Sequence, residues 1–301
     1  MDLDNKSPHV ERLFARQAEC GRAIERFLYG IFRRIKGASE FAFAGFYAMI
    51  LKLSGNTPQR VVIYYHSIKS SDVRSFRRQM AWLAANCNVV EPSRIATAPT
   101  NGGTLVAVTI DDGFASALEN AVPILKEYGL AAGFFIPAGR LGQKAGWEIA
   151  QHCRDKDESV VDQHQVRQLA EKGFEILSHT LSHPRLTKVK DHQLETELVA
   201  SKQALEQIIG HEISGISYPH GDYDDRVCAY AQRAAYKTGF TIEPVAVDYT
   251  TDFMRIGRFL VSPRESLIKF RLKIRGAYQA LRFVRTVKKS ILRSWDKCRT
   301  K

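Results

Sequence analysis

From residue 60 onward, apolar and polar positions follow two alternating patterns. Runs of apolar and β-branched residues, such as 60–66 and 104–110, are typical of strands that are buried on both faces. Between them, apolar residues recur every three or four positions, as at Phe76 and Met80 within 73–87, which indicates helices. Further strands are predicted at 130–137, 174–179, 213–219, 238–244 and 253–261, and further helices at 116–129, 162–173, 192–210 and 226–236.

This alternation of strands and helices predicts an α/β fold. Strand and helix alternate at least six times, which is the pattern of a parallel sheet covered by helices. A closed barrel and an open doubly wound sheet both fit this pattern. The segment TIDDGFAS after the second strand has one glycine and matches neither phosphate-binding glycine motif, so the sequence disfavours nucleotide binding.

The two flanks lack the strand pattern. Residues 1–59 are predicted to be a helical N-terminal flank, and 60–262 to form the α/β domain. Residues 263–301 are predicted to form one amphipathic helix with a basic polar face. Its apolar positions are Phe270, Ile274, Tyr278, Leu281, Val284, Val287, Ile291 and Trp295.

The net charge of +12 is unevenly distributed. Residues 264–301 hold 13 basic and 2 acidic residues, and residues 1–60 hold 10 and 6. The remaining 61–263 hold 21 basic and 24 acidic residues, so the central domain is slightly acidic. This distribution favours attachment of the ends to an anionic partner over a domain built to bind nucleic acid.

The cysteines and the N-terminus bear on location. The five cysteines are widely spaced without a CxxC motif, which argues against a disulfide framework and favours free thiols in a reducing compartment. The N-terminal residues are acidic and polar, unlike a signal peptide. The apolar stretch 41–51 would cover roughly 16 Å as a helix, about half a bilayer core. We therefore expect a cytoplasmic protein without a signal peptide or transmembrane helix.

Candidate chemistry gathers at three predicted strand ends. Asp111 and Asp112 end one strand, His179 and His183 follow another, and Tyr-Pro-His-Gly at 218–221 follows a third. In α/β folds, sites are built at the C-terminal ends of strands. Two histidines at i and i+4 on a helical turn can bind one cation. One aspartate with two histidines leaves coordination positions open for water and substrate.

Each motif alone has a simpler interpretation. The aspartate pair can be an Asx turn or the N-cap of helix 116–129. The histidines can be solvated or hydrogen-bonded, and Tyr-Pro-x-Gly can be an ordinary turn. Their occurrence together, in this order and at these strand ends, favours a hydrolytic metal site.

With these motifs the chain resembles the polysaccharide deacetylases of carbohydrate esterase family 4, which carry the nodulation-type chitooligosaccharide deacetylase homology domain. The matching motifs are Thr-Ile-Asp-Asp-Gly at 109–113, His-Thr-Leu-Ser-His at 179–183 and the Tyr-Pro-x-Gly of a bacterial branch. Segments 64–68 and 146–147 also resemble that branch. The resemblance covers about residues 60–262 and implies a deformed (β/α) barrel with about seven parallel strands.

The resemblance also implies an activity and a set of roles. The activity is metal-dependent removal of N-acetyl or similar N-acyl groups from amino sugars of a polysaccharide, oligosaccharide or lipid-linked glycan. Asp112, His179 and His183 would bind a divalent metal, most often zinc, with cobalt or nickel as alternatives. Asp111 would be the general base. The metal and a backbone N–H near Tyr218, Pro219, His220 and Gly221 would hold the substrate oxyanion.

Two departures from the family pattern shift roles to other residues. Many members carry an arginine in the third motif where this chain has Ser217, and Arg258 is predicted to orient the base instead. No histidine follows His220. In the bacterial branch that this chain resembles, the early histidine of a Tyr-His motif takes the place of the general acid, which implies His66 here, with a structural strand-end histidine as the alternative. Trp147 either lines the site or lies in the core.

Two other functions fit parts of the sequence. A catalytically inactive glycan-binding relative would explain the two departures. An anionic-surface or nucleic-acid-binding protein would rest on the basic tail alone, and we expect no nucleic-acid partner. For the tail, we expect peripheral attachment of 264–301 to the anionic inner face of a membrane. The alternative is a solvated tail that packs partly on the barrel, and the sequence leaves the oligomeric state open.

Overall fold

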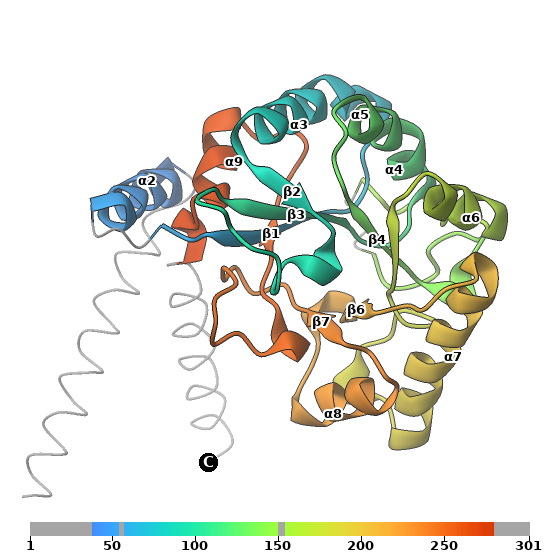
Figure 1. The fold of residues 1–301 in the computed structure, drawn as a ribbon. Coiled ribbons are helices and arrows are strands. Elements are labelled where there is room, and N and C mark those ends of the chain that lie inside the picture. The colour runs from blue at the N-terminus through green and yellow to red at the C-terminus, as the bar shows by residue number, and fades with distance from the viewer. Residues whose placement is uncertain (1–37, 54–56, 150–153, 280–301) are drawn as a thin grey trace, which may run out of the picture.

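A computed structural model describes residues 38–53, 57–149 and 154–279 of the 301-residue chain. Its strands form one parallel sheet in the order β7-β6-β5-β4-β3-β1-β8, with β2 paired to β3 off that path. Figure 1 shows the strands curving about a common axis, with helices on the outside. The strands are β1 (Arg60–Tyr65), β2 (Asn88–Val90), β3 (Leu105–Ile110), β4 (Gly133–Ile136), β5 (Glu175–Ser178), β6 (Gly215–Ser217), β7 (Thr238–Phe240) and β8 (Phe259–Leu260). The predicted deformed (β/α) barrel with about seven parallel strands is confirmed.

The helices predicted within residues 60–262 are present in the structure, and one of them is divided into two. The predicted helix 116–129 is two short helices that meet at Ala121, because Pro123 lacks the N–H that a continuous helix would use. The helices are α2 (Ala38–Leu53), α3 (Val73–Asn86), α4 (Ala115–Asn120), α5 (Val122–Glu127), α6 (Gln163–Glu171), α7 (Asp191–Ile209), α8 (Asp225–Arg233) and α9 (Leu267–Ile274). The 3-10 helices are η1 (Ser70–Asp72), η2 (Pro92–Arg94), η3 (Ala138–Arg140), η4 (Leu186–Lys188), η5 (Pro219–Gly221), η6 (Phe253–Arg255) and η7 (Ala277–Gln279).

The central strands β1 and β3 are buried along their whole length. They pair in register from Arg60 opposite Leu105 to Tyr65 opposite Ile110. Parallel strands in register end at the same level of the sheet, so the residues that follow them emerge side by side. This pairing brings His66 and Asp111 to the same edge.

Alternation along the strands divides the core into two apolar layers. Val61 and Ile63 of β1 belong to the large cluster between the sheet and its helices. Val62 belongs to a smaller cluster inside the barrel, together with Phe135 and Phe240. Successive side chains of a strand point to opposite faces, so strands buried on both faces are apolar throughout.

The described part of the C-terminal flank differs from the predicted single helix. Helix α9 ends at Ile274, and Gly276 takes a left-handed conformation (φ 70°) before η7. Phe270, Ile274 and Tyr278, which the sequence placed on the apolar face of that helix, are all buried. Residues 267–279 therefore pack on the barrel, while residues 280–301 lie outside the described residues.

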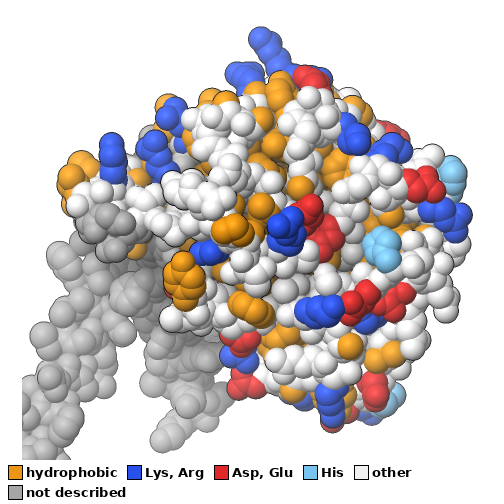
Figure 2. Space-filling view, in the orientation of Figure 1, with side chains coloured by type: hydrophobic (Ala, Val, Ile, Leu, Met, Phe, Trp, Pro, Cys, Tyr) orange, Lys and Arg blue, Asp and Glu red, His pale blue; other side chains and the backbone are white. Residues whose placement is uncertain are grey.

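Helix α2 is the described part of the N-terminal flank, and residues 1–37 lie outside it. Ala44 and Leu51 are buried, and the helix contacts α9 and η7. Phe46, Met49 and Leu53 are 51–79% exposed on its other side. Figure 2 shows exposed hydrophobic side chains where α2 lies, beside Lys and Arg side chains. Among the described helices, none combines the length and the apolar character needed to cross a bilayer.

Candidate active site and metal centre

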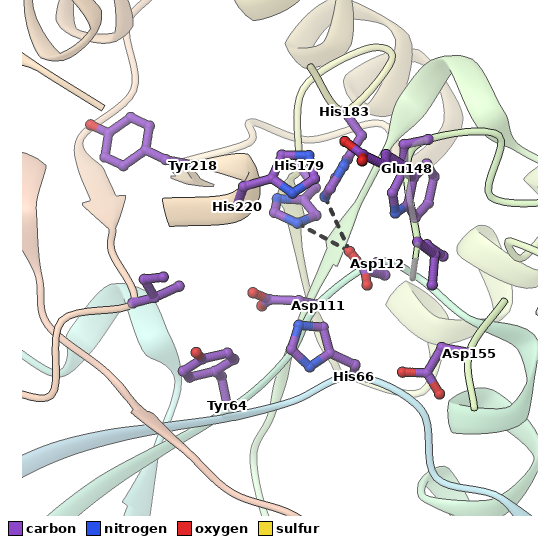
Figure 3. Close-up of a pocket in the computed structure, with 13 residues that line it drawn as sticks. Tyr64, His66, Asp111, Asp112, Glu148, Asp155, His179, His183, Tyr218 and His220 are labelled. Carbon is purple, nitrogen blue, oxygen red and sulfur yellow. Dashed lines mark ion pairs between the residues drawn. The ribbon is translucent and has the colours of Figure 1, made fainter. Parts of the chain in front are cut away.

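The C-terminal ends of the parallel strands surround a pocket of about 350 Å³. His66 follows β1, the aspartate pair follows β3, His179 follows β5 and Tyr218 follows β6. The strand ends thus bring together residues that are far apart in the sequence (Figure 3). The pocket is lined by Tyr64, His66, Asp111, Asp112, Trp147, Glu148, Ile149, Asp155, His179, His183, Tyr218, His220 and Ile242.

Asp112, His179 and His183 form a buried cluster of possible metal ligands. The Nε2 atoms of both histidines lie 3.3 Å from the same carboxylate oxygen of Asp112. Tetrahedral bonds of about 2.0–2.1 Å to a zinc ion would place two ligand atoms about 3.3–3.4 Å apart. The donor types and their spacing therefore fit a divalent metal.

The backbone turn after β3 lets both aspartates reach the pocket. Side chains of adjacent strand residues point to opposite faces, but Asp112 has a left-handed backbone (φ 69°) and Gly113 another (φ 59°). Aspartate tolerates this conformation better than most residues, because its short polar side chain can bond locally. The extended chain that continues β3 therefore ends at Asp111, and the turn directs Asp112 toward the histidines.

The two histidines of this cluster are held by a loop and not by the helical turn that the sequence suggested. Thr180 and His183 both have left-handed backbones, with φ of 66° and 65°. Within the loop, the N–H of His183 donates to Oγ1 of Thr180 (3.1 Å) and the N–H of Thr180 donates to Oγ of Ser178 (3.1 Å). Side-chain hydroxyls thus replace the helical hydrogen bonds.

Hydrogen bonding and burial prepare both imidazoles as ligands. Nδ1 of His179 lies 2.8 Å from the carbonyl oxygen of Ser217, which can only accept, so Nδ1 carries the proton and Nε2 is free. Burial lowers the pKa of His183 to about 4, so its ring is neutral at neutral pH. Burial alone would raise the pKa of Asp112, but the neighbouring imidazoles of His179 and His183 hold it well below its ordinary value.

Asp111 has a different partner. Its two oxygens accept from Nη1 and Nη2 of Arg258 at 2.7 and 2.8 Å, and Oγ of Ser217 lies 3.3 Å from one of them. Arg258 is fully buried and also donates to the carbonyl of Thr241 (3.0 Å). Burial would raise the pKa of Asp111, but the charge of Arg258 outweighs this effect and lowers it. Asp111 is therefore an ionised carboxylate beside the cluster of Asp112, His179 and His183.

Aromatic side chains complete the walls around the two carboxylates. His66 lies on the β1 side of the pocket, facing Asp111 and Asp112 (Figure 3). The guanidinium carbon Cζ of Arg258 lies over the Tyr64 ring, 4.5 Å from the ring centroid. Trp147, for which the sequence left two positions open, stacks on the His183 ring with centroids 4.4 Å apart. It therefore lines the site.

Most backbone N–H groups of the third motif, at 218–221, are already bonded within the fold. The N–H of Tyr218 donates to Phe240 (3.1 Å), its hydroxyl donates to Met254 (2.9 Å), and the N–H of Gly221 donates back to Tyr218 (2.9 Å). Pro219 has no N–H, so within this motif only the N–H of His220 has no partner among the described residues. Gly221 is required sterically, since a Cβ there would lie 2.2 Å from Ile242.

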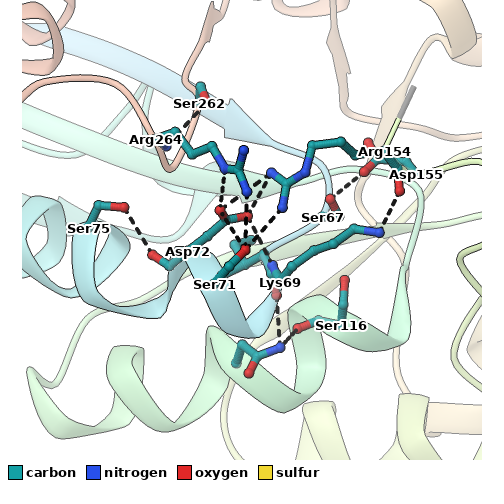
Figure 4. A network of polar contacts seen from close by, with 12 residues as sticks. Ser67, Lys69, Ser71, Asp72, Ser75, Ser116, Arg154, Asp155, Ser262 and Arg264 are labelled. Atoms are coloured by element: carbon teal, nitrogen blue, oxygen red, sulfur yellow. Dashed lines mark hydrogen bonds and ion pairs between the residues drawn. The ribbon is translucent and has the colours of Figure 1, made fainter. Parts of the chain in front are cut away.

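A polar cluster anchors the chain that follows Trp147 in the pocket wall. The buried Asp72 accepts from Nη1 of Arg154 (3.0 Å) and from Nε of Arg264 (2.7 Å), and we call these three residues the Asp72 cluster. Next to Arg154, Asp155 accepts from the hydroxyl of Ser67 (Figure 4). The cluster joins η1, the pocket wall and the chain after β8.

Several pocket residues escaped the sequence analysis. Tyr64 could have been found from the sequence. It lies on β1, two positions before His66, so the two side chains face the same side if the chain stays extended. Glu148, Ile149 and Asp155 come from an irregular segment, and Ile242 follows β7, so neither a motif nor a periodicity identifies them.

Residues 98–239 match the family model described as polysaccharide deacetylase. This stretch contains the aspartate pair, the two histidines and the third motif, but neither His66 nor Arg258. The chain is 28% identical over 227 residues to the putative polysaccharide deacetylase YxkH of Bacillus subtilis (strain 168), which covers 72% of this chain and 75% of the relative.

A second relative and two solved structures are more distant. The poly-beta-1,6-N-acetyl-D-glucosamine N-deacetylase of Staphylococcus aureus (strain N315) is 26% identical over 175 residues, which is 54% of this chain and 57% of the relative. The Streptococcus pyogenes deacetylase PplD in complex with acetate has a TM-score of 0.61 at 21% identity, over 73% of this chain and 99% of that one. IcaB from Ammonifex degensii has a TM-score of 0.60 at 23% identity, over 74% and 97%. These two structures share the fold of this chain.

Proposed function

Because this chain carries a polysaccharide deacetylase domain, we propose that it is a metal-dependent hydrolase that removes N-acetyl or similar N-acyl groups from amino sugars of a glycan. The observation that carries this proposal is the pairing of a buried Asp-His-His cluster with a second, separate carboxylate. Asp112 faces the histidines, and Asp111 faces Arg258. Metal-dependent hydrolysis of an amide uses a metal-ligand set to activate water and a separate base to accept its proton.

Asp112, His179 and His183 are the proposed ligands of a divalent ion. Two imidazole nitrogens and one carboxylate oxygen suit zinc best, and cobalt or nickel accept the same donors. The bound ion would acidify a water molecule and polarise the acyl carbonyl. The proton on Nδ1 of His179 keeps Nε2 free for this ligand set.

The remaining roles belong to side chains around the ligands. Asp111 accepts the proton of the attacking water, and Arg258 holds both of its oxygens so that the carboxylate cannot rotate. The water oxygen adds to the acyl carbon, and the N–H of His220 is the proposed donor to the carbonyl oxygen as it gains charge. His66 then protonates the leaving nitrogen, so that the C–N bond breaks into a carboxylic acid and a free amine.

Two of the relatives are named for polysaccharide or poly-N-acetylglucosamine deacetylation, and we propose that this chain also acts on a glycan. We propose an N-acetylhexosamine oligomer or polymer, or a lipid-linked amino sugar. The pocket of about 350 Å³ accommodates one sugar unit, and Trp147 provides a flat apolar wall. The chain covers 57% of the staphylococcal relative, so the substrate of that enzyme is one candidate among several.

The test combines metal analysis with product detection. Purified protein should contain close to one equivalent of divalent metal, and it should release acetate and free amine from N-acetylhexosamine oligomers or lipid-linked sugars. Asp111→Asn should bind the same metal and release both products far more slowly. An inactive glycan-binding relative would instead bind the oligomers with a filled metal site and release no amine in the wild type.

We also propose that residues 264–301 attach the enzyme to the anionic cytoplasmic face of a membrane, with 60–262 as the catalytic domain between the flanks 1–59 and 263–301. The support is charge, because residues 280–301 contain eight basic residues and one acidic residue. The apolar side chains at 270, 274 and 278 are buried, so this attachment would rest on residues beyond 279.

A further inference from the structure

Glu197 lies on α7 and binds the loop between the two histidine ligands. Its Oε2 accepts from the N–H of Leu181 (2.9 Å) and from the N–H of Ser182 (2.8 Å). Its Oε1 accepts from the hydroxyl of Ser182. One carboxylate therefore binds three donors on two consecutive residues.

The loop needs such an acceptor because of its backbone conformation. It lies outside helix and strand, so the N–H groups of Leu181 and Ser182 have no acceptor in regular secondary structure. Consecutive N–H groups that converge in this way form a concave site for an anion. An N–H left unpaired in a partly buried place costs about 1–3 kcal/mol, which would favour a rearranged loop.

On its other side, the loop makes backbone hydrogen bonds to η3. The N–H of Ala138 donates to the carbonyl of Thr180 (3.0 Å), and the N–H of Gly139 donates to the carbonyl of Leu181 (2.7 Å). The carbonyls of the loop thus bind η3 while its N–H groups bind Glu197. Without Glu197, nothing among the described residues would replace the contact on the α7 side.

The position of the carboxylate is fixed by its helix. Leu194 and Leu198, on the turns around Glu197, are fully buried. No lysine or arginine among the described residues forms an ion pair with Glu197, so the loop is its main partner. A carboxylate on a packed helix can therefore set where the loop lies.

We propose that Glu197 is a positioning residue that fixes the separation of His179 and His183 and thereby sets the affinity of the site for its metal. This inference rests on the proposed function, since it assumes that these histidines are ligands. Glu197 acts through the loop and does not contact the metal. Groups behind a metal's ligands typically change its affinity 10–100-fold when they are lost, in order of magnitude.

The test measures metal affinity separately from activity and from folding. Apoprotein would be titrated with Co²⁺ and followed by visible absorption, while the melting temperature of the apoprotein is recorded by circular dichroism. Glu197→Ala should weaken Co²⁺ binding about 10–100-fold. Glu197→Gln should lose much less, because its amide oxygen can accept both N–H groups and its NH₂ can donate to the Ser182 hydroxyl.

Glu195 offers a matched control on the same helix. It is exposed, and Glu195→Ala should leave the Co²⁺ affinity unchanged. If Glu197→Ala fails to fold, Glu197→Asp replaces it, since the shorter carboxylate cannot reach all three donors and should also weaken binding.

The possible outcomes separate the two proposals. If folded Glu197→Ala melts at a lower temperature but binds Co²⁺ as tightly as the wild type, the side chain is only structural and the positioning role is wrong. If Glu197→Gln is as impaired as Glu197→Ala, geometry is not what Glu197 supplies, and the inference also fails. If the wild type binds no Co²⁺, the proposed function itself is overturned.

Discussion

Asp111 and Asp112 are adjacent residues with separate partners, and the separation follows from one backbone turn. Asp111 ends the extended chain and meets Arg258 inside the barrel. Asp112 has a left-handed backbone and meets both histidines. Two carboxylates that shared one site would raise each other's pKa, whereas here each has its own compensating groups. Each can therefore remain ionised and carry a different role.

This separation predicts unequal effects of substitution. Asp112→Ala should lose the bound metal, because it removes the ligand atom that both imidazoles approach. Asp111→Asn should keep the metal and lower kcat by about 10²–10⁴-fold, the usual contribution of a general base. Elemental analysis of the two purified variants, beside acetate release, checks this. Equal metal loss in both would contradict the assigned roles.

Arg258 should stabilise the folded protein as well as orient the Asp111 carboxylate. Its guanidinium is fully buried against Asp111, so Arg258→Met leaves a buried carboxylate without its counter-charge. We expect the free energy of unfolding to fall by about 3–5 kcal/mol, and the double variant with Asp111→Asn to recover part of that loss. Urea denaturation of all four proteins measures this coupling.

An exposed ion pair provides the comparison. Lys237 and Glu212 lie 2.6 Å apart with side chains that are 65% and 51% exposed. Lys237→Met should change the free energy of unfolding by no more than about 1 kcal/mol. Equal losses of unfolding free energy from Lys237→Met and Arg258→Met would show that burial of the Arg258–Asp111 pair does not determine its contribution to stability.

At the scale of elements, the Asp72 cluster joins segments that no strand pairing connects. Asp72 ends η1, Arg154 lies next to Asp155 of the pocket wall, and Arg264 follows β8. Both arginines are partly exposed, at 39% and 55%, while Asp72 is fully buried. Loss of the Asp72 carboxylate would remove the contact that holds Arg154, next to Asp155 of the pocket wall.

The stability that Asp72 supplies should depend on pH. Burial raises its pKa, but hydrogen bonds from Arg264 and Arg154 outweigh this and lower it below the ordinary 3.8. A carboxylate with a lowered folded pKa contributes fully above the unfolded pKa and loses that contribution as pH falls through the folded one. Asp72→Asn should therefore unfold about 1–3 kcal/mol more easily at pH 7.

The pH series distinguishes this charge effect from a packing defect. The difference between wild type and Asp72→Asn should shrink as pH falls below 3.8, because the wild-type carboxyl becomes neutral. Urea unfolding at several pH values from 7 to 3 follows it. A difference that stays constant across this range would mean that the missing charge is not the cause.

The elements themselves were largely predictable from the sequence. Apolar runs identified the long strands, and helical spacing identified α3, α6, α7 and α8. Strand β2 was missed because only Asn88–Val90 pair, and none of the three is buried. The loop of the two histidines was misjudged because spacing alone cannot reveal left-handed residues such as Thr180.

At the scale of the whole molecule, strand order decides which distant residues meet. Strand β1 pairs with β3, which brings His66 and Asp111 to one edge of the sheet. It also pairs with β8, which places Arg258 inside the barrel, within reach of Asp111. The pairing of Asp111 with Arg258 spans 147 residues. No local pattern encodes that contact, so the sequence could suggest Arg258 only by elimination. The motif residues were found more directly, because each follows a recognisable strand.

The proposed membrane attachment belongs to the same scale. Three charges in the basic tail, removed by Lys288→Ser, Lys289→Ser and Arg293→Ser, should weaken binding to anionic vesicles by about two orders of magnitude, at roughly 1 kcal/mol for each charge. Sedimentation with phosphatidylserine vesicles measures this. Lys144→Ser, Lys156→Ser and Lys188→Ser together remove the same charge from the barrel and should leave binding unchanged. Equal effects of the two triple variants would argue against the tail.

Four of the six non-glycine residues with positive φ in the described chain lie at the site: Asp112, Thr180, His183 and His220. Each such conformation disfavours the folded state by roughly 1–2 kcal/mol relative to an ordinary backbone. Selection for turnover therefore opposes selection for thermal robustness at these positions. A descendant released from catalysis could gain heat resistance by accepting glycine there. A high melting temperature would then be no sign of an intact enzyme, and an inactive relative could outlast an active one on heating.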